Sequence, residues 1–261
     1  MGLDAALHGK RRRPGLPAPL HGSRVHSAPD RVALKGVGAV LLDIEGTTTP
    51  IAFVHQTLFG YARARVSGFL EQHWNDPEVR ADVAGLEAEQ ADDVAAVVGH
   101  VHWLMDQDRK STGLKSLQGK IWEEGYRAGD LRGEVYPDVP PALQRWRHQG
   151  IDIAIFSSGS VQAQRSLFAS TAAGDLTRFI HAYFDTTIGP KTAPGSYARI
   201  AAALERSPSE VLFLSDVGAE LDAARTAGMR TALCVRTPES APSTGAHPVI
   251  RTLEDLAAVG R

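Results

Sequence analysis

The sequence of 261 residues contains a single cysteine, Cys234, and no apolar run of membrane-spanning length. One cysteine cannot form an intramolecular disulfide, and it cannot supply the cysteine cluster of a structural zinc site. Neither sign of charge prevails, because 28 lysines and arginines face 30 aspartates and glutamates, for a net charge of −2. This balance argues against nucleic acid and against an acidic membrane surface as partners. We therefore expect a cytoplasmic protein that binds neither.

The hydrophobic share of 43% is close to that of globular proteins, so the chain can bury a substantial core. Its length suffices for one large α/β domain or for a core with a smaller lobe. Residues 1–35 differ from the rest, because a basic run at 10–13 precedes prolines at 14, 17 and 19. No apolar segment follows the basic run, which argues against a signal peptide and a twin-arginine export signal. We expect residues 1–35 to form a disordered basic tail, with an anion-binding arm as the alternative.

The chain is organised around residues 40–50, with the sequence VLLDIEGTTTP. The apolar start is typical of a buried parallel strand, and the glycine, threonines and proline favour a turn. Because α/β sheets place their chemistry at the carboxyl ends of strands, Asp43 should lie at a strand tip facing a crevice. Glu45 is two residues further on, so an extended chain points both carboxylates to the same side. The pair can form a metal site, an acid/base pair or a solvated turn.

Residues 53–134 have a helical pattern and no strand signal. Their apolar residues recur at spacings of three and four, which predicts an all-helical insert directly after the first strand. Charged residues interrupt the pattern at 106–113, where Arg109 and Lys110 lie near Lys115. This cluster is either a solvated surface or part of a lid loop that brings positive charge to an anionic substrate.

From residue 135 onward, strand patterns alternate with helix patterns, which argues for a parallel sheet covered on both faces. The expected strands lie at 151–156, 183–185, 211–214 and 231–235, and a short helix is expected at 253–259. Such a sheet brings the carboxyl ends of its strands together over one crevice. The polar residues that follow these strands should therefore meet.

Ser157 and Ser158 come between a strand and a helix start, where unpaired backbone N–H groups can hold a phosphate. Helix capping by a serine is the ordinary alternative. Asp216 follows another strand. Lys191 lies in a loop, where a single lysine is usually solvated and does not by itself indicate a binding site. Acidic groups from two strands can bind Mg²⁺, while hydroxyls and a lysine hold a phosphate against it. In that arrangement Asp43 has the position of a nucleophile that attacks phosphorus and forms an aspartyl-phosphate.

The order of these motifs resembles that of the haloacid dehalogenase-like (HAD) phosphatases, from about residue 37 to the C-terminus. The insert after the first motif is similar to the helical cap of the first type in that superfamily. The resemblance implies an α/β fold, with a HAD-like Rossmannoid core and its doubly wound parallel sheet at 36–52 and 135–261. It implies an all-helical cap domain at 53–134. Most members have aspartate where this chain has Glu45, a departure that narrows the match.

Five segments together resemble the enolase-phosphatase E1 (acireductone synthase) family of methionine salvage: DIEGTTTPI at 43–51, LMDQDRK at 104–110, LKSLQG at 114–119, SSGSV at 157–161 and IGPK at 188–191. The resemblance implies a Mg²⁺-dependent phosphoric monoester hydrolase with two activities. The enzyme would enolise 2,3-diketo-5-methylthiopentyl-1-phosphate and then remove its phosphate, leaving the acireductone 1,2-dihydroxy-3-keto-5-methylthiopentene. The resemblance further implies one Mg²⁺ per subunit, a small phosphorylated diketone as the only partner, and a monomer.

By the same resemblance, the metal-site positions are Asp43, Glu45 and Asp216, and the substrate-binding positions are Ser157, Ser158 and Lys191. Asp43 is expected to be the nucleophile. Glu45 is expected to protonate the leaving oxygen and then activate water. It can also bind the metal through its backbone carbonyl. Glu220, four residues after Asp216, either supports the metal from outside its ligands or lies on a helix surface.

Three other functions use the same residues. They are a general HAD phosphatase without enolisation, a haloacid dehalogenase that needs no metal, and a catalytically silent phosphometabolite-binding protein. Asp216 and Glu45 argue against the dehalogenase, and the retained reactive groups argue against the silent protein. The sequence leaves open which groups polarise the diketone and how far the lid moves.

Overall fold

The computed structural model describes residues 32–86, 91–107, 109, 111–237 and 246–257. Residues 1–31 of the expected basic tail lie outside the described residues. Val32–Ala33 form a short strand, β1, that pairs in parallel with β8 (Leu256–Ala257). In the described part of the chain, no helix is both long enough and apolar enough to cross a membrane.

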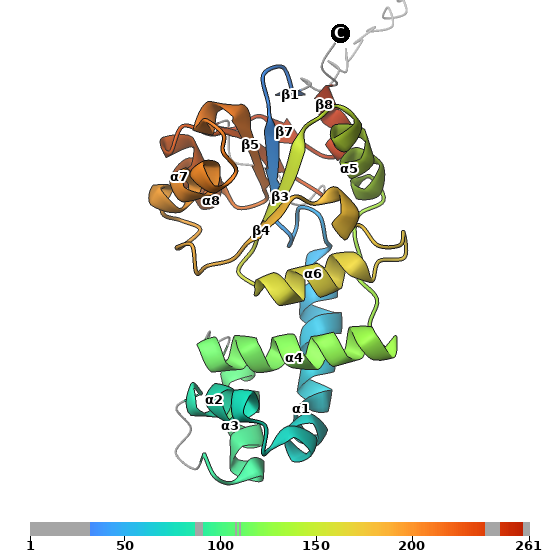
Figure 1. The fold of residues 1–261 in the computed structure, drawn as a ribbon, viewed down its shortest axis with the longest axis vertical. Coiled ribbons are helices and arrows are strands. Elements are labelled where there is room, and N and C mark those ends of the chain that lie inside the picture. Colours follow the sequence, from blue (N-terminus) through green and yellow to red (C-terminus); the bar gives the residue numbers. More distant parts are fainter. Residues whose placement is uncertain (1–31, 87–90, 108, 110, 238–245, 258–261) are drawn as a thin grey trace, which may run out of the picture.

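A six-stranded parallel sheet forms the upper part of the molecule in Figure 1. Its strands are β2 (Ala39–Leu42), β3 (Asp152–Phe156), β4 (Ala182–Phe184), β5 (Val211–Ser215), β6 (Arg230–Cys234) and β7 (Val249–Ile250). Their order in space is β4-β3-β2-β5-β6-β7, so β2 lies in the interior and the chain winds outward in both directions. This order confirms the predicted doubly wound parallel sheet.

Successive side chains of each buried strand point to opposite faces, so both faces of the sheet are apolar. Helices cover both of them. Val40 and Leu42 pack in one apolar cluster with α5 (Val139–His148), and Leu41 packs in another with α7 (Pro194–Ala203) and α8 (Gly218–Thr226). In Figure 1, α5 lies on the right of the sheet and α7 and α8 lie on the left. Three single 3₁₀ turns complete this part: η2 (Thr177–Phe179), η3 (Pro208–Glu210) and η4 (Leu253–Asp255).

Between β2 and β3, the described residues form helices and no strand, as the sequence predicts. The chain enters a π-helical turn, η1 (Phe53–Leu58), and continues as α1 (Phe59–His73), α2 (Pro77–Ala84), α3 (Val94–Asp106) and α4 (Thr112–Ala128). Gly129 ends α4 in the left-handed conformation, with φ of 80°, which glycine adopts without strain.

The helices α1 to α4 lie beyond the carboxyl ends of the strands (Figure 1). α6 (Val161–Ala169) lies between the sheet and α4, and α4 packs against it. Gly119 is at this crossing, where a Cβ would lie 3.4 Å from Oγ of Ser160. The close approach of α4 and α6 places the helical insert over the edge of the sheet where the polar residues gather.

Candidate active site

Asp43 lies directly after β2, at the carboxyl edge of the sheet. Its backbone N–H donates to the carbonyl oxygen of Leu214 on β5 at 3.0 Å, so the strand ladder holds it in line. The residue is 4% exposed, and its Oδ1 accepts a hydrogen bond from the N–H of Ile44 at 2.8 Å. A buried carboxylate needs compensating partners. For Asp43 they are Lys191 and Ser215, from two later segments of the chain.

Lys191 joins Asp43 to Glu220 in a buried charge cluster. Its Nζ lies 2.6 Å from Oδ1 of Asp43 and 2.7 Å from Oε2 of Glu220. Burial lowers the pKa of Lys191, but the two carboxylate charges outweigh burial and raise the pKa above its ordinary value. The ammonium therefore stays protonated. Ser215 Oγ lies 3.2 Å from Oδ2 of Asp43 and 3.1 Å from Oε2 of Glu220, and its one proton goes to either.

Asp216, at the end of β5, lies over the turn that follows Asp43. Gly46 in that turn has φ of 68°, and a Cβ there would overlap the carboxylate of Asp216. Burial, together with the charge of Asp43, raises the pKa of Asp216 to about 7. The fold thus brings Asp43, Asp216 and Lys191 together, although they are far apart in sequence.

The charges at this point suit a hard cation. Asp43, Asp216 and Glu220 are three carboxylates against the single ammonium of Lys191. Burial raises the pKa of Asp216 first, and the charges of Asp43 and Glu220 add to that rise. Within the described ranges, no group of three or more His, Cys, Asp or Glu side chains is placed so that these side chains alone could hold a metal ion. Two carboxylates without such a group fit Mg²⁺, which keeps several waters and takes few protein ligands. They do not fit structural Zn²⁺, which takes four protein ligands.

The carboxylate of Glu45 is paired outside this cluster. Its Oε1 lies 2.7 Å from Nε2 of His55, which is in the π-helical turn η1. Both side chains are partly exposed, at 42% for Glu45 and 56% for His55. Within the described residues, the Glu45 carboxylate therefore pairs with His55 and not with Lys191.

A cavity of about 570 Å³ lies between the sheet edge and the helices, and Glu45 and His55 line it. Ser157 and Ser158 line it as well. Helix α6 is capped by a different serine, because the N–H of Ala163 donates to Oγ of Ser160 at 3.2 Å. Helix capping therefore does not account for Ser157 and Ser158.

The helical side of the cavity contributes two cations and an apolar wall. Arg109 and Lys115 belong to the charged cluster noted in the sequence, and both line the cavity. Lys110, the third member of that cluster, lies outside the described residues. The apolar wall comes from η1, α1, α3 and α4, through Leu58, Phe59, Leu104, Met105 and Trp122.

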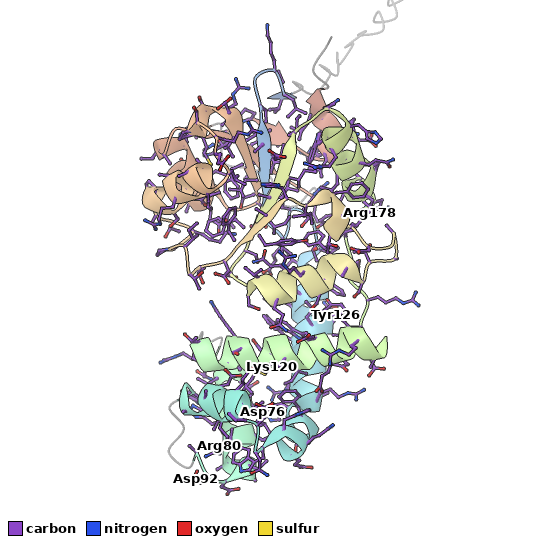
Figure 2. The ribbon with its side chains drawn as sticks, viewed as in Figure 1. Asp76, Arg80, Asp92, Lys120, Tyr126 and Arg178 are labelled. Carbon is purple, nitrogen blue, oxygen red and sulfur yellow. The ribbon has the colours of Figure 1, made fainter. Side chains whose placement is uncertain are left out.

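Tyr126 on α4 lies where this wall approaches α6 (Figure 2). Its buried hydroxyl has no hydrogen-bond partner in the described part of the chain. Burial raises the pKa of this hydroxyl, so it stays protonated as a potential donor.

Two residues of the site were not predicted from the sequence: His55 and Ser215. For Glu220 the sequence left two alternatives, support of the metal from outside its ligands or a place on the helix surface. Ser215 and Glu220 flank Asp216 at the end of β5 and the start of α8. Their closeness to the carboxyl end of a strand could have indicated from the sequence that they belong to the site. Glu220 is 9% exposed and does not lie on the helix surface. His55 gave no signal, because a single histidine in a helical pattern has no distinguishing spacing.

Comparisons with known proteins agree with this geometry. A family model described as haloacid dehalogenase-like hydrolase matches residues 37–228. Enolase-phosphatase E1 of Synechococcus elongatus is 50% identical over 232 residues, which span 84% of this chain and 98% of the relative. A protein of the same name from Sorangium cellulosum is 49% identical over 84% of this chain and 97% of its own.

Among solved structures, the UTR4 protein of Saccharomyces cerevisiae superposes with a TM-score of 0.71 at 35% identity. The superposition covers 83% of this chain and 98% of the yeast protein. Similarity thus extends over the sheet and the helical insert alike. The chain belongs to the enolase-phosphatase E1 family within the haloacid dehalogenase-like hydrolases.

Proposed function

We propose that this enzyme converts 2,3-diketo-5-methylthiopentyl-1-phosphate into 1,2-dihydroxy-3-keto-5-methylthiopentene and phosphate, by enolisation followed by dephosphorylation. The observation that carries this proposal is the buried contact between Asp43 and Lys191, at 2.6 Å. The two residues that follow Asp43 in the sequence, Ile44 and Glu45, line a cavity with both polar and apolar side chains. A phosphate needs a cation such as Lys191 beside the nucleophile, and the apolar side chains of the cavity suit a thioether chain.

Asp43 is the nucleophile of the phosphatase step. One of its carboxylate oxygens attacks phosphorus, the bond from phosphorus to the substrate oxygen breaks, and an aspartyl-phosphate forms. Lys191, already protonated beside Asp43, offsets the negative charge that gathers there. Ser157 and Ser158, which follow the neighbouring strand β3 and line the cavity, bind the phosphate.

Glu45 moves the protons. As a carboxylic acid it protonates the leaving oxygen, and as a carboxylate it takes a proton from the water that hydrolyses the aspartyl-phosphate. Glutamate reaches one methylene further than aspartate, and this reach lets Glu45 also act at the carbon next to the substrate carbonyl during enolisation. His55, 2.7 Å away, holds the carboxylate toward the cavity.

One Mg²⁺ per subunit would be held by the carboxylates of Asp43 and Asp216 and by the backbone carbonyl of Glu45. When bound, it supplies positive charge that reduces the repulsion between the nucleophile and the phosphate. The burial of Asp216 beside the charge of Asp43, which raises the pKa of Asp216 to about 7, supports this assignment.

The helices of residues 53–134 act as a cap domain over the α/β core of residues 36–52 and 135–261. Their apolar side chains exclude water from the thioether end of the substrate. We expect the enzyme to work as a cytoplasmic monomer, which gel filtration with light scattering tests directly for the oligomeric state.

The experiment that tests the proposed function follows both products of the diketo phosphate, the enol by ultraviolet absorbance and the phosphate by a coupled assay. The proposal predicts a transient enol signal before phosphate appears. Phosphate release without enolisation would favour the alternative, a general small-molecule phosphatase of the same fold. Activity that survives EDTA would contradict the assigned metal.

The special role of Glu45 is tested by Glu45→Asp, assayed separately for the two steps. The proposal predicts that enolisation falls more than phosphate release, because aspartate keeps the carboxylate but shortens its reach. An equal loss in both steps, or no loss in either, would remove the assignment of Glu45 to enolisation.

A further inference from the structure

Two chain segments join the helical insert to the sheet, and they run side by side. The outgoing segment follows Asp43, and the returning segment comes back to α5 from Gly129. The backbone N–H of Tyr136 in the returning segment donates to the carbonyl oxygen of Thr48 in the outgoing one at 2.9 Å. Any shift of one segment is therefore passed to the other.

Arg236, two residues after β6, binds the outgoing segment from a third direction. Its Nε and Nη2 donate to the carbonyl oxygen of Thr47 at 2.9 and 2.6 Å. The Arg236 side chain is 6% exposed, and Thr47 is fully buried. Two donors of a rigid guanidinium directed at one carbonyl fix the position and the orientation of that peptide group.

The same guanidinium also binds the returning segment. Its Nη1 donates to Oδ2 of Asp138 at 2.6 Å, and its carbon lies 4.4 Å from the centroid of the Tyr136 ring. Asp138 Oδ2 in turn accepts from the N–H of Leu253 at 2.6 Å. Arg236 thus touches both connections between the sheet and the helices, and anchors them to the C-terminal part of the core.

The outgoing segment that Arg236 holds is the turn that carries the reacting carboxylates. Thr48 Oγ1 lies 3.1 Å from the carbonyl oxygen of Asp43, and the Thr48 N–H donates to the carbonyl of Ile44 at 2.9 Å. Asp43, Glu45 and the peptide group of Thr47 belong to one short hydrogen-bonded turn. Fixing one end of it fixes the direction in which the carboxylates point.

We propose that Arg236 is a positioning residue for catalysis, which clamps the two connections and so sets the turn of Asp43 and Glu45 relative to the helical wall of the cavity. It acts through Thr47 and Tyr136 and does not touch the substrate. This inference rests on the proposed roles of Asp43 and Glu45. Asp138 is its buried partner, and a lysine cannot replace Arg236, because an ammonium lacks the planar fork.

The test compares Arg236→Lys with a matched control, Arg206→Lys. Arg206 also pairs with an aspartate, Asp152, at 2.8 Å, but at the opposite edge of the sheet, where β3 begins. With the diketo phosphate at a temperature where both variants are folded, Arg236→Lys should lower kcat roughly 10- to 100-fold, the cost of misplacing reacting groups by about an ångström. KM should change little, and Arg206→Lys should leave kcat unaltered.

A second variant separates positioning from simple loss of packing. In Arg236→Gly, millimolar guanidinium should restore part of the lost kcat by refilling the fork, and ammonium at the same concentration should not. Equal effects of the two cations, or an unchanged kcat in Arg236→Lys, would overturn the proposal.

Hydrogen exchange supplies a readout that does not depend on turnover. The Tyr136 amide should exchange faster in Arg236→Lys than in the wild type, and at the wild-type rate in Arg206→Lys. If the wild type itself fails to convert the diketo phosphate, the proposed function fails. The exchange rates then test the positioning role of Arg236 separately. Faster exchange of the Tyr136 amide in Arg236→Lys supports this role, and unchanged exchange overturns it.

Discussion

At the scale of single residues, the chemistry depends on how Asp43 is surrounded. The sequence alone predicts that Asp43, Lys191 and Asp216 meet, because the carboxyl ends of parallel strands lie at one edge of a sheet. It does not predict that Glu45 pairs with His55. Alternation of side chains holds only for an extended chain, and the left-handed Gly46 turns the backbone immediately after Glu45.

His55→Ala removes the contact that holds the Glu45 carboxylate. We expect kcat to fall roughly tenfold, less than the 100-fold or greater loss typical of deleting a general acid or base, because Glu45 itself remains. His102→Ala is the control, since the partner of His102 Nε2 among the described residues is the backbone carbonyl of Arg63, within the helical insert. Steady-state phosphate release measures both variants. Equal kcat values for His55→Ala and the wild type would contradict the role given to His55.

Tyr126→Phe should stabilise the protein by about 1 kcal/mol, because it removes a buried hydroxyl with no partner among the described residues. Tyr197→Phe is the opposite case. Tyr197 donates to the carbonyl oxygen of Lys191 at 2.7 Å, so its loss should cost about 1 kcal/mol. Urea unfolding midpoints give both values. If the two substitutions destabilise alike, the hydroxyl of Tyr126 has a partner in solution.

At the scale of helices and strands, the sequence predicts most long elements and misses the shortest. β2, β3 and β5 are built mainly from continuous apolar runs, and such runs are strong signals for buried parallel strands. β1, β7 and β8 have two residues each, too few to show any period.

The helix expected at 253–259 is wrong within the described residues, because Leu253–Asp255 form one 3₁₀ turn and the chain then extends as β8. Pairing of β8 with β1 overrides the local pattern. The first segment expected to be α-helical after β2 is π-helical over Phe53–Leu58, and this segment carries His55. Single π-helical turns often occur at functional sites, but the spacing of apolar residues in a sequence does not reveal them.

Asp152 on β3 pairs with Arg147 on α5 and with Arg206 in the connection after α7, and its contribution to stability depends on pH. Burial alone would raise its pKa, but hydrogen bonds from Arg206 and Arg147 and the nearby cations outweigh burial and lower it. A carboxylate with a lowered pKa stabilises the folded state above the unfolded pKa, about 4, and loses this effect as the pH falls through the folded pKa. Asp152→Asn should therefore lower the unfolding free energy at pH 7.

The same variant and the wild type should converge as the pH falls well below about 4, where the wild-type carboxylate is protonated. Urea unfolding at several pH values measures the difference. A gap between the two proteins that is constant across this range would show that the effect is one of packing and not of charge.

At the scale of the whole molecule, the sheet supplies the charged groups and the helices supply the apolar wall. The cavity between them is lined from the sheet edge by Glu45, Ser157 and Ser158, and the insert reaches it because α4 packs on α6. Composition and periodicity predict the two parts but not their contact, which depends on small residues such as Gly119 at the crossing. The paired helical and α/β parts explain how one chain can hold a phosphate and a thioether at once.

Mg²⁺ should stabilise the whole molecule if it binds the folded state alone. At about 100 times its Kd, a ligand of this kind adds about 2.7 kcal/mol of unfolding free energy, which appears as a higher Tm. Asp216→Asn should abolish the Mg²⁺-dependent rise. Asp222→Asn, on the exposed side of α8, should retain it. A rise of the same size in both variants would place the cation elsewhere.

The central claim is that Asp43 accepts the phosphoryl group, and Asp43→Asn tests it most directly. The amide keeps the size of the side chain and removes its nucleophilic charge. Phosphate release from the diketo phosphate is measured for this variant in the presence of Mg²⁺, with circular dichroism to establish that it is folded. We predict a folded protein with no detectable phosphate release, and turnover near the wild-type rate would contradict the covalent route.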